Sequence, residues 1–276
     1  MKPAPFDLTT ARDAAEAAAL TGDGSPEARI VAGGQSLGPM LNLRLARPAH
    51  LVDISRAADL RAVTDEGDRL LYGAAVTHAE IEDGAVPDAT GGWLREIAGR
   101  IAYRAVRNRG TLGGSLVHAD PAADWVVTLT ALGAEAVVAD PAGAVRVEPL
   151  ATFIAGPFAT TLRRGEILTG VRIAKRGPQA RWGYWKFTRK VGEFAKASAA
   201  VLIDDRTGEV RLVAGAIERP PILLPDAGAV LSGTLSAEEA LRRALPDRPA
   251  RTLALHAVAL REAIDIAAGR PHRGAA

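Results

Sequence analysis

Two glycine pairs, each flanked by short polar side chains, are the feature that most constrains the fold of this chain. The first lies in "VAGGQSLG" (31–38), directly after a strand-like entry, and the second lies in "RNRGTLGGSLVH" (107–118). Glycine has no Cβ atom, so its N–H group can approach an anion closely and its φ angle is free. We therefore expect both loops to present bare backbone to an anionic ligand, with Ser36, Thr111 and Ser115 as hydroxyl donors.

Neither loop carries one of the commoner nucleotide-binding fingerprints. A Walker loop requires a Gly-Lys-Ser/Thr run, and no lysine follows either glycine pair. The G-x-G-x-x-G spacing of a Rossmann fold is also absent from both loops. Each loop taken alone is compatible with a plain turn, in which glycine is the usual residue. The two together favour one dinucleotide whose diphosphate is held between two bends.

The cysteine count limits the chemistry that this chain can carry by itself. None of the 276 residues is cysteine, which excludes disulfides, thiolate catalysis and cysteine-ligated zinc or iron–sulfur centres. The net charge of +2 gives no electrostatic case for nucleic acid, although "RWGYWKFTRK" (181–190) mixes basic and aromatic residues. We interpret that segment as a strand with Trp182, Tyr184 and Lys186 on one face and Trp185 on the other.

Membrane and metal sites are not expected either. No run approaches the roughly 20 apolar residues of a spanning helix, and the N-terminus lacks an apolar signal segment, so a cytoplasmic protein is expected. His118, Asp120 and Asp124 could be imagined as a metal site, but one histidine and two carboxylates at a helix start are poor evidence.

Hydrophobic patterning predicts a mixed α and β chain. Strands are expected in "ARIVA" (28–32) and "HLVDIS" (50–55), and helices in "GGWLREIAGRIA" (91–102) and from Asp120, where an N-cap acceptor precedes a proline. After residue 134 the pattern changes to a hairpin and further strands, and two helices follow at the C-terminus. Strands followed by helices suggest an α+β module at this end of the chain.

Longer stretches around the two loops resemble a known family. "AGGQSLGPMLNLRLARP" (32–48) and "VRNRGTLGGSLVHADPAAD" (106–124) look like the two flavin signatures of the FAD-binding medium subunits, or domains, of molybdenum hydroxylases. This is the carbon monoxide dehydrogenase and xanthine dehydrogenase group. "TTLRRGEILTGVRI" (160–173) and "WKFTRKVGEFA" (185–195) resemble its later landmarks. The likeness runs in order from about residue 5 to residue 215.

The resemblance implies an α+β fold in three parts. A two-part FAD-binding domain of the vanillyl-alcohol oxidase/PCMH type would occupy residues 1–55 and 56–177. A small α+β domain of the carbon monoxide dehydrogenase flavoprotein type, with a three-stranded sheet and helices, would occupy residues 178–276. In "VGEFAKAS" this chain has Glu193 and Lys196 where the family prefers an aspartate and an apolar residue, which leaves the local lining open.

The resemblance also implies which residues bind FAD. The first loop would wrap the diphosphate with Ala32, Gly33, Gly34, Gln35, Ser36 and Leu37, and the second would contact phosphate and ribityl groups with Thr111, Gly113, Gly114 and Ser115. Further contacts are expected from His78, Ile101, Asp124, Leu168 and Lys186. The basic run 107–109 would ordinarily be a solvated turn, but before a phosphate loop its charge would help to neutralise the ligand. Asp124 could equally serve the dipole of its helix, and His78 could be an ordinary core histidine.

By resemblance, the chain is the FAD-carrying electron-transfer subunit of a molybdenum-containing dehydrogenase or hydroxylase, with no catalytic acid or base of its own. A large molybdopterin-binding subunit would oxidise the substrate, and a small iron–sulfur subunit would pass the electrons to FAD, in a dimer of heterotrimers. The external acceptor is open among NAD⁺, oxygen and a quinone. Two alternatives remain: an autonomous flavoenzyme of the vanillyl-alcohol oxidase type, and a non-catalytic adaptor that has lost FAD.

Overall fold

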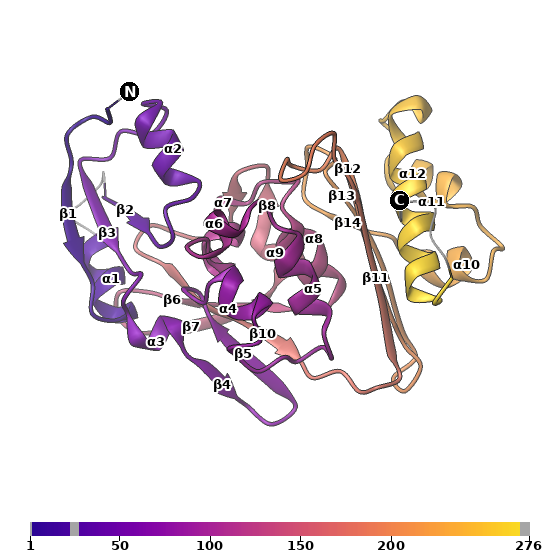
Figure 1. The fold of residues 1–276 in the computed structure, drawn as a ribbon, viewed down its shortest axis with the longest axis horizontal. Helices are drawn as coiled ribbons and strands as arrows, with labels where there is room; N and C mark the ends of the chain where they lie inside the picture. The colour runs from indigo at the N-terminus through magenta and orange to yellow at the C-terminus, as the bar shows by residue number, and fades with distance from the viewer. Residues whose placement is uncertain (1, 23–27, 271–276) are drawn as a thin grey trace.

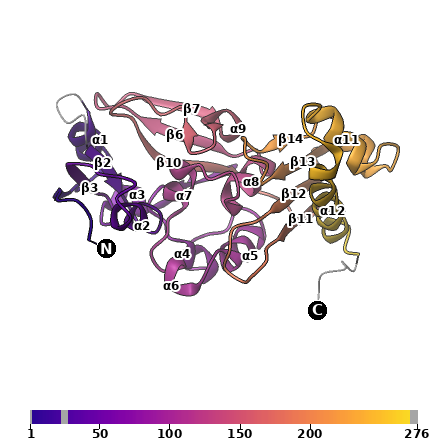
Figure 2. The same cartoon turned by 90° about the horizontal axis from the view of Figure 1, so that it is seen from above.

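The computed structural model describes residues 2–22 and 28–270. The ribbon is elongated, with an N-terminal lobe at one end, a central part, and the C-terminal helices at the other end (Figure 1). The view from above shows the same order of parts (Figure 2). One buried hydrophobic cluster lies in the N-terminal lobe, a second joins the central part to the C-terminal sheet, and a third lies between that sheet and its helices.

The N-terminal lobe is a parallel three-stranded sheet with short helices. Its elements are β1 (Asp7–Thr10), α1 (Ala14–Thr21), β2 (Ala28–Val31), α2 (Leu37–Asn42), β3 (His50–Asp53) and α3 (Ala58–Arg61). Strands β1 and β2 flank β3, and both run parallel to it. The first glycine loop joins the carboxyl end of β2 to α2, a position at which parallel sheets commonly bind ligands.

The central part is an antiparallel five-stranded sheet, in the order β4-β5-β10-β6-β7, packed against helices. Its strands are β4 (Val63–Asp65), β5 (Arg69–Gly73), β6 (Glu135–Ala139), β7 (Val145–Pro149) and β10 (Ile167–Ala174), with a small hairpin of β8 (Ile154–Gly156) and β9 (Ala159–Thr160). Its helices are α4 (His78–Glu82), α5 (Trp93–Arg100), α6 (Arg104–Arg107), α7 (Leu112–His118), α8 (Asp124–Ala131) and α9 (Leu150–Phe153). The second glycine loop leads into α7.

The predicted start of one helix is wrong. Helix α8 begins at Asp124, whereas Asp120 belongs to a turn before it. The Asp120 Oδ1 accepts a hydrogen bond from the Ala122 N–H at 2.9 Å, and the Asp120 carbonyl oxygen accepts one from the Ala123 N–H at 2.9 Å. Because the carboxylate is used in this local turn, it does not cap the helix. The later start places Asp124 and Trp125 together in the first turn of α8.

The C-terminal part is a four-stranded sheet with three helices on its outer face (Figures 1 and 2). It comprises β11 (Ala180–Phe187), β12 (Ala197–Asp204), β13 (Glu209–Gly215), β14 (Ile222–Leu223), α10 (Ala227–Leu231), α11 (Ala237–Ala244) and α12 (Ala250–Ala267). The two-residue strand β14 extends the three strands that were predicted. The predicted faces of β11 are confirmed, since Trp182 stacks on Trp93 of α5 at 5.4 Å while Trp185 packs against the helices of the outer face. Among the described residues, no helix has the length and apolar character needed to cross a membrane.

Candidate functional site

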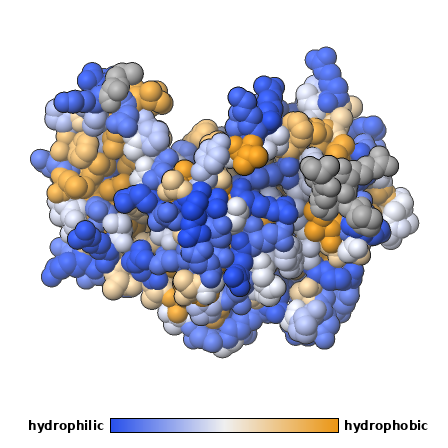
Figure 3. Space-filling view, in the orientation of Figure 1, coloured by the Kyte–Doolittle hydropathy of each residue, from blue (hydrophilic) through white to orange (hydrophobic). Residues whose placement is uncertain are grey.

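The two glycine loops meet beside a single cleft. A Cβ atom on Gly33 would lie 1.9 Å from the carbonyl oxygen of Arg109, so the first loop rests directly on the second. The Arg109 Nε also donates a hydrogen bond to the Gly33 carbonyl oxygen at 3.3 Å. The cleft has a volume of about 1160 Å³ and is lined by residues of all three parts of the chain. The space-filling view shows the surface hollowed between the N-terminal lobe and the central part (Figure 3).

Every residue that the sequence analysis assigned to the site lines this cleft. They are Ala32, Gly33, Gly34, Gln35, Ser36 and Leu37 of the first loop, Thr111, Gly113, Gly114 and Ser115 of the second loop, and His78, Ile101, Asp124, Leu168 and Lys186. Their contacts with FAD stay a prediction, but the structure brings these separate sequence segments together on one surface.

The first loop supplies unpaired backbone donors. Gly34 has a φ of +70°, which favours glycine. The N–H groups of Gly34, Gln35 and Ser36 donate to no acceptor among the described residues. Successive N–H groups in such a turn form a concave site for an anion. This is the surface that the sequence analysis expected for a diphosphate.

The second loop differs from that expectation, because its backbone donors are already used. The Gly113 N–H donates to the Ala74 carbonyl oxygen at 2.9 Å, and the Gly114 N–H donates to Thr111 Oγ1 at 3.1 Å. A Cβ atom on Gly113 would lie 2.5 Å from the Ala74 Cβ, so this glycine is needed for packing against the protein. The second loop therefore offers hydroxyl groups to a ligand, from Thr111 and Ser115, in place of bare amides.

Asp124 and Lys186 form a largely buried ion pair in the cleft wall. The Lys186 Nζ lies 2.6 Å from the Asp124 Oδ1 and donates a second hydrogen bond to the Arg100 carbonyl oxygen at 2.9 Å. The hydroxyl of Tyr184 also donates to the Asp124 Oδ1, at 2.7 Å. Burial, together with the Asp124 charge, raises the pKa of Tyr184 well above its ordinary value, so the phenol stays protonated. Asp124 thus anchors two side chains of β11.

His78 is buried at the start of α4, behind the second loop. Its Nδ1 accepts a hydrogen bond from the Trp125 Nε1 at 3.0 Å. Burial, and then the nearby charge of Arg107, lowers the pKa of the imidazole to about 4. The ring is therefore neutral near pH 7.

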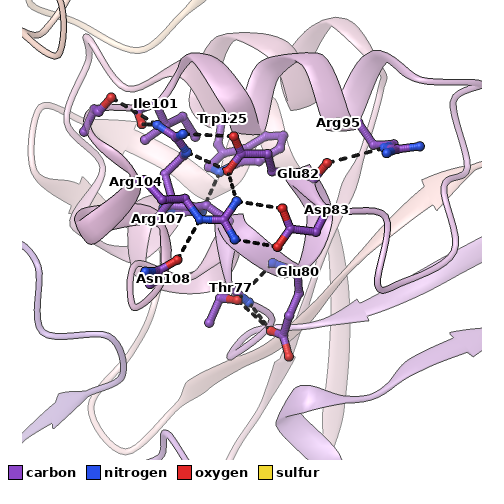
Figure 4. A network of polar contacts seen from close by, with 12 residues as sticks. Thr77, Glu80, Glu82, Asp83, Arg95, Ile101, Arg104, Arg107, Asn108 and Trp125 are labelled. Atoms are coloured by element: carbon purple, nitrogen blue, oxygen red, sulfur yellow. Dashed lines mark hydrogen bonds and ion pairs between the residues drawn. The ribbon is translucent and has the colours of Figure 1, made fainter.

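Within the basic run 107–109, the charge of Arg107 is taken up by an acidic partner, while Arg109 contacts the first glycine loop through the Gly33 carbonyl oxygen. Arg107 binds both carboxylate oxygens of Glu82, and Arg104 binds Glu82 and Asp83 (Figure 4). The hydrogen bond from Arg107 lowers the pKa of the Glu82 carboxyl group, so the pair stays charged. Neither Arg107 nor Arg109 lines the cleft.

Other cleft residues were missed by the sequence analysis. Cations come from the N-terminal lobe, as Arg29 and Arg47, and apolar lining comes from Met40, Leu45, Pro48, Phe158, Leu162 and Phe194. Arg47 and its neighbours lie inside the quoted signature 32–48, so the motif already contained this signal. Leu162 and Phe194 likewise lie inside the quoted segments 160–173 and 185–195, whereas Phe158 lies between β8 and β9, outside every quoted segment.

The residues of the cleft fit FAD. The unpaired amides of the first loop and the hydroxyls of Thr111 and Ser115 suit a diphosphate, and apolar side chains such as Ile101 and Leu168 suit a planar ring. The volume is in the range of large cofactor pockets, on the order of 1,000 Å³. Among the described residues, no group of three or more His, Asp or Glu side chains is placed to hold a metal ion.

Comparison with known proteins places the chain in a family. The "FAD binding domain in molybdopterin dehydrogenase" matches residues 4–175. The nicotine 6-hydroxylase medium subunit of Paenarthrobacter nicotinovorans is 37% identical over 218 residues, which cover 78% of this chain and 76% of that protein. The carbon monoxide dehydrogenase medium chain of Hydrogenophaga pseudoflava is 35% identical over 203 residues, which cover 74% of this chain and 70% of that protein.

Solved structures extend the likeness to the whole chain. A chain of carbon monoxide dehydrogenase from Hydrogenophaga pseudoflava has a TM-score of 0.87 and 30% identity, covering 98% of this chain and 99% of that chain. Quinoline 2-oxidoreductase from Pseudomonas putida 86 has a TM-score of 0.85 and 31% identity, with coverage of 98% and 99%. The fold is the FAD-binding PCMH-type fold, followed by the C-terminal part that these structures share. The chain belongs to the FAD-binding medium subunits of the molybdenum hydroxylase family.

Proposed function

We propose that this chain is the FAD-carrying electron-transfer subunit of a heteromeric molybdenum-containing dehydrogenase or hydroxylase. The observation that carries the proposal is the meeting of the two glycine loops on one cleft, within a chain of this family. Bound FAD would supply the capacity to accept electrons singly and release them as a pair. The substrate is oxidised elsewhere, so no residue of this chain acts on it as an acid or a base.

The chain's own residues bind and orient the cofactor. The amides of Gly34, Gln35 and Ser36 would hold the diphosphate, and Thr111 would contribute a hydroxyl, whose oxygen accepts from the Gly114 N–H and whose hydrogen has no acceptor within the described residues. The buried Leu168 excludes water from the cleft wall. The work of the protein in such a site is positioning and electrostatic tuning of the cofactor.

Partners must supply the remaining centres. This chain has no cysteine, so iron–sulfur clusters belong to a small partner subunit, and a large partner carries molybdopterin. We infer a heterotrimer that pairs into a dimer of heterotrimers. The side chains of Tyr103, Val191 and Phe194 are exposed at the cleft rim, and Tyr103 is held beside Val191 by a hydrogen bond to its carbonyl oxygen at 2.8 Å. Exposed apolar side chains that lie together support docking of the iron–sulfur partner at this rim.

Val191→Glu is expected to weaken binding of the iron–sulfur subunit about tenfold, because Val191 is 80% exposed at the rim and a charge there would be desolvated in the interface. Val145→Glu is the matched control, since Val145 is 62% exposed on β7 and no residue of β7 lines the cleft, whereas Gly192, next to Val191, does. Affinities are measured by titrating purified partner onto each flavin-loaded variant. Equal affinities for the two variants would place the interface elsewhere.

The function itself is tested by purifying the chain alone and together with its partners. We expect about one FAD per chain, reduced rapidly only when a reduced iron–sulfur subunit is added. A colourless protein that takes up no FAD would favour the adaptor. A yellow protein reduced by an organic substrate without any partner would favour an autonomous flavoenzyme.

A further inference from the structure

The imidazole of His78 has a defined tautomer, because its Nδ1 faces a group that can only donate. The indole N–H of Trp125 has no lone pair to offer, and it lies 3.0 Å from the His78 Nδ1. Nδ1 must therefore accept this hydrogen bond. The ring is neutral near pH 7, so its single proton is on Nε2.

The Nε2 atom lies at the cleft. His78 lines the cleft, and its Nε2 has no acceptor among the described residues. A Cβ atom on Gly110 would lie 2.8 Å from Nε2, which places this nitrogen against the residue that precedes Thr111. The protonated nitrogen is thus beside the second loop, next to Gly110, which also lines the cleft.

Both the backbone and the helix of His78 are fixed. Its N–H donates to the Gly110 carbonyl oxygen at 2.9 Å, which ties it to the second loop. Thr77 and Glu80 form a capping box at the start of α4, and Arg107 holds Glu82 at its end (Figure 4). The imidazole is therefore oriented before any ligand arrives, which lowers the entropic cost of using it.

We propose that His78 is a cofactor-binding donor, whose Nε2–H is directed into the cleft toward an oxygen of the bound dinucleotide, and that Trp125 is the positioning residue that selects this tautomer. The proposal rests on the proposed function. Trp125 is fully buried and does not line the cleft. It would therefore affect cofactor affinity only through its hydrogen bond to His78.

Two variants separate the two nitrogens of the ring. In His78→Asn the amide oxygen can replace Nδ1 as the acceptor for Trp125, but the donor in the cleft is lost, and FAD should bind about tenfold more weakly. In His78→Gln the amide nitrogen can replace Nε2, so affinity should stay within about threefold of the wild type. His50→Asn is the control, since His50 contacts Thr9 at the surface of β3 and does not line the cleft.

The tautomer is measured directly on the wild-type chain by two-bond proton–nitrogen NMR correlations of the histidine rings. We expect Nε2 protonated and Nδ1 unprotonated in His78, and a mixture of tautomers in Trp125→Phe with weaker FAD binding. A protonated Nδ1 in the wild type, or unchanged FAD affinity in His78→Asn, would overturn the inference while the proposed function stands. A wild-type chain that binds no FAD would overturn both.

Discussion

Gly33→Ala should give a protein that retains no FAD through purification. The new Cβ would lie 1.9 Å from the Arg109 carbonyl oxygen, 2.5 Å from its carbonyl carbon and 2.9 Å from the Gly110 Cα. All three atoms are backbone, so no flexible side chain can turn aside. The two loops would have to separate, which costs at least ~1–3 kcal/mol of overpacking and removes the paired wall of the cleft. We expect FAD affinity to fall at least about a hundredfold.

Gly38→Ala is the matched control for this prediction. Gly38 lies in α2, five residues after Gly33, and a Cβ there would meet nothing within 4 Å. Alanine also favours the helix over glycine by roughly 0.5–1 kcal/mol, so this variant should be at least as stable as the wild type. FAD affinity is measured by quenching of flavin fluorescence in a titration of the apoprotein. If Gly33→Ala binds FAD as well as Gly38→Ala, the contact between the loops is not needed for the site.

The place of the site could be predicted from the sequence, but the reason for each glycine could not. A glycine pair beside hydroxyl residues is a local signal, which is why both loops were found. Gly113 is required because its backbone packs on Ala74, a residue of another segment, and its N–H is bonded there. Gly114 is constrained within its own loop, since a Cβ there would lie 2.7 Å from Thr111 Oγ1.

The same distinction between local and distant signals holds for the fold and for the charges. Alternation along 181–190 predicted the two faces of β11, because a strand repeats every two residues. Asp120 is a different case, because its carboxylate accepts from the Ala122 N–H in a local turn that the residue types of a helix start do not exclude. Arg107 precedes the second loop, but Glu82 from α4 takes its charge. A partner that comes from another part of the chain leaves no trace in the local pattern.

Asp124→Asn is the other substitution with a large expected effect. Lys186 would lose its counter-charge and keep only neutral hydrogen-bond acceptors, among them the Arg100 carbonyl oxygen, with its side chain 15% exposed. An uncompensated buried charge costs about 3–5 kcal/mol, so we expect the free energy of unfolding to fall by ~3 kcal/mol. The amide oxygen can still accept from Tyr184, so the loss reports the charge and not the phenol bond. The measurement is urea unfolding of the apoprotein.

An exposed pair of the same residue types shows whether burial is the cause. Lys175 and Asp65 lie 2.7 Å apart, with side chains 38% and 64% exposed. Asp65→Asn should therefore cost less than about 1 kcal/mol, since water screens and replaces the lost interaction. In the double variant Asp124→Asn with Lys186→Met the buried charge is gone, and much of the stability should return. Equal losses in the free energy of unfolding from Asp124→Asn and Asp65→Asn would show that the cleft wall solvates Lys186 as well as the surface does. The charge of Asp124 would then not be needed for stability, and its role would be limited to the ligand.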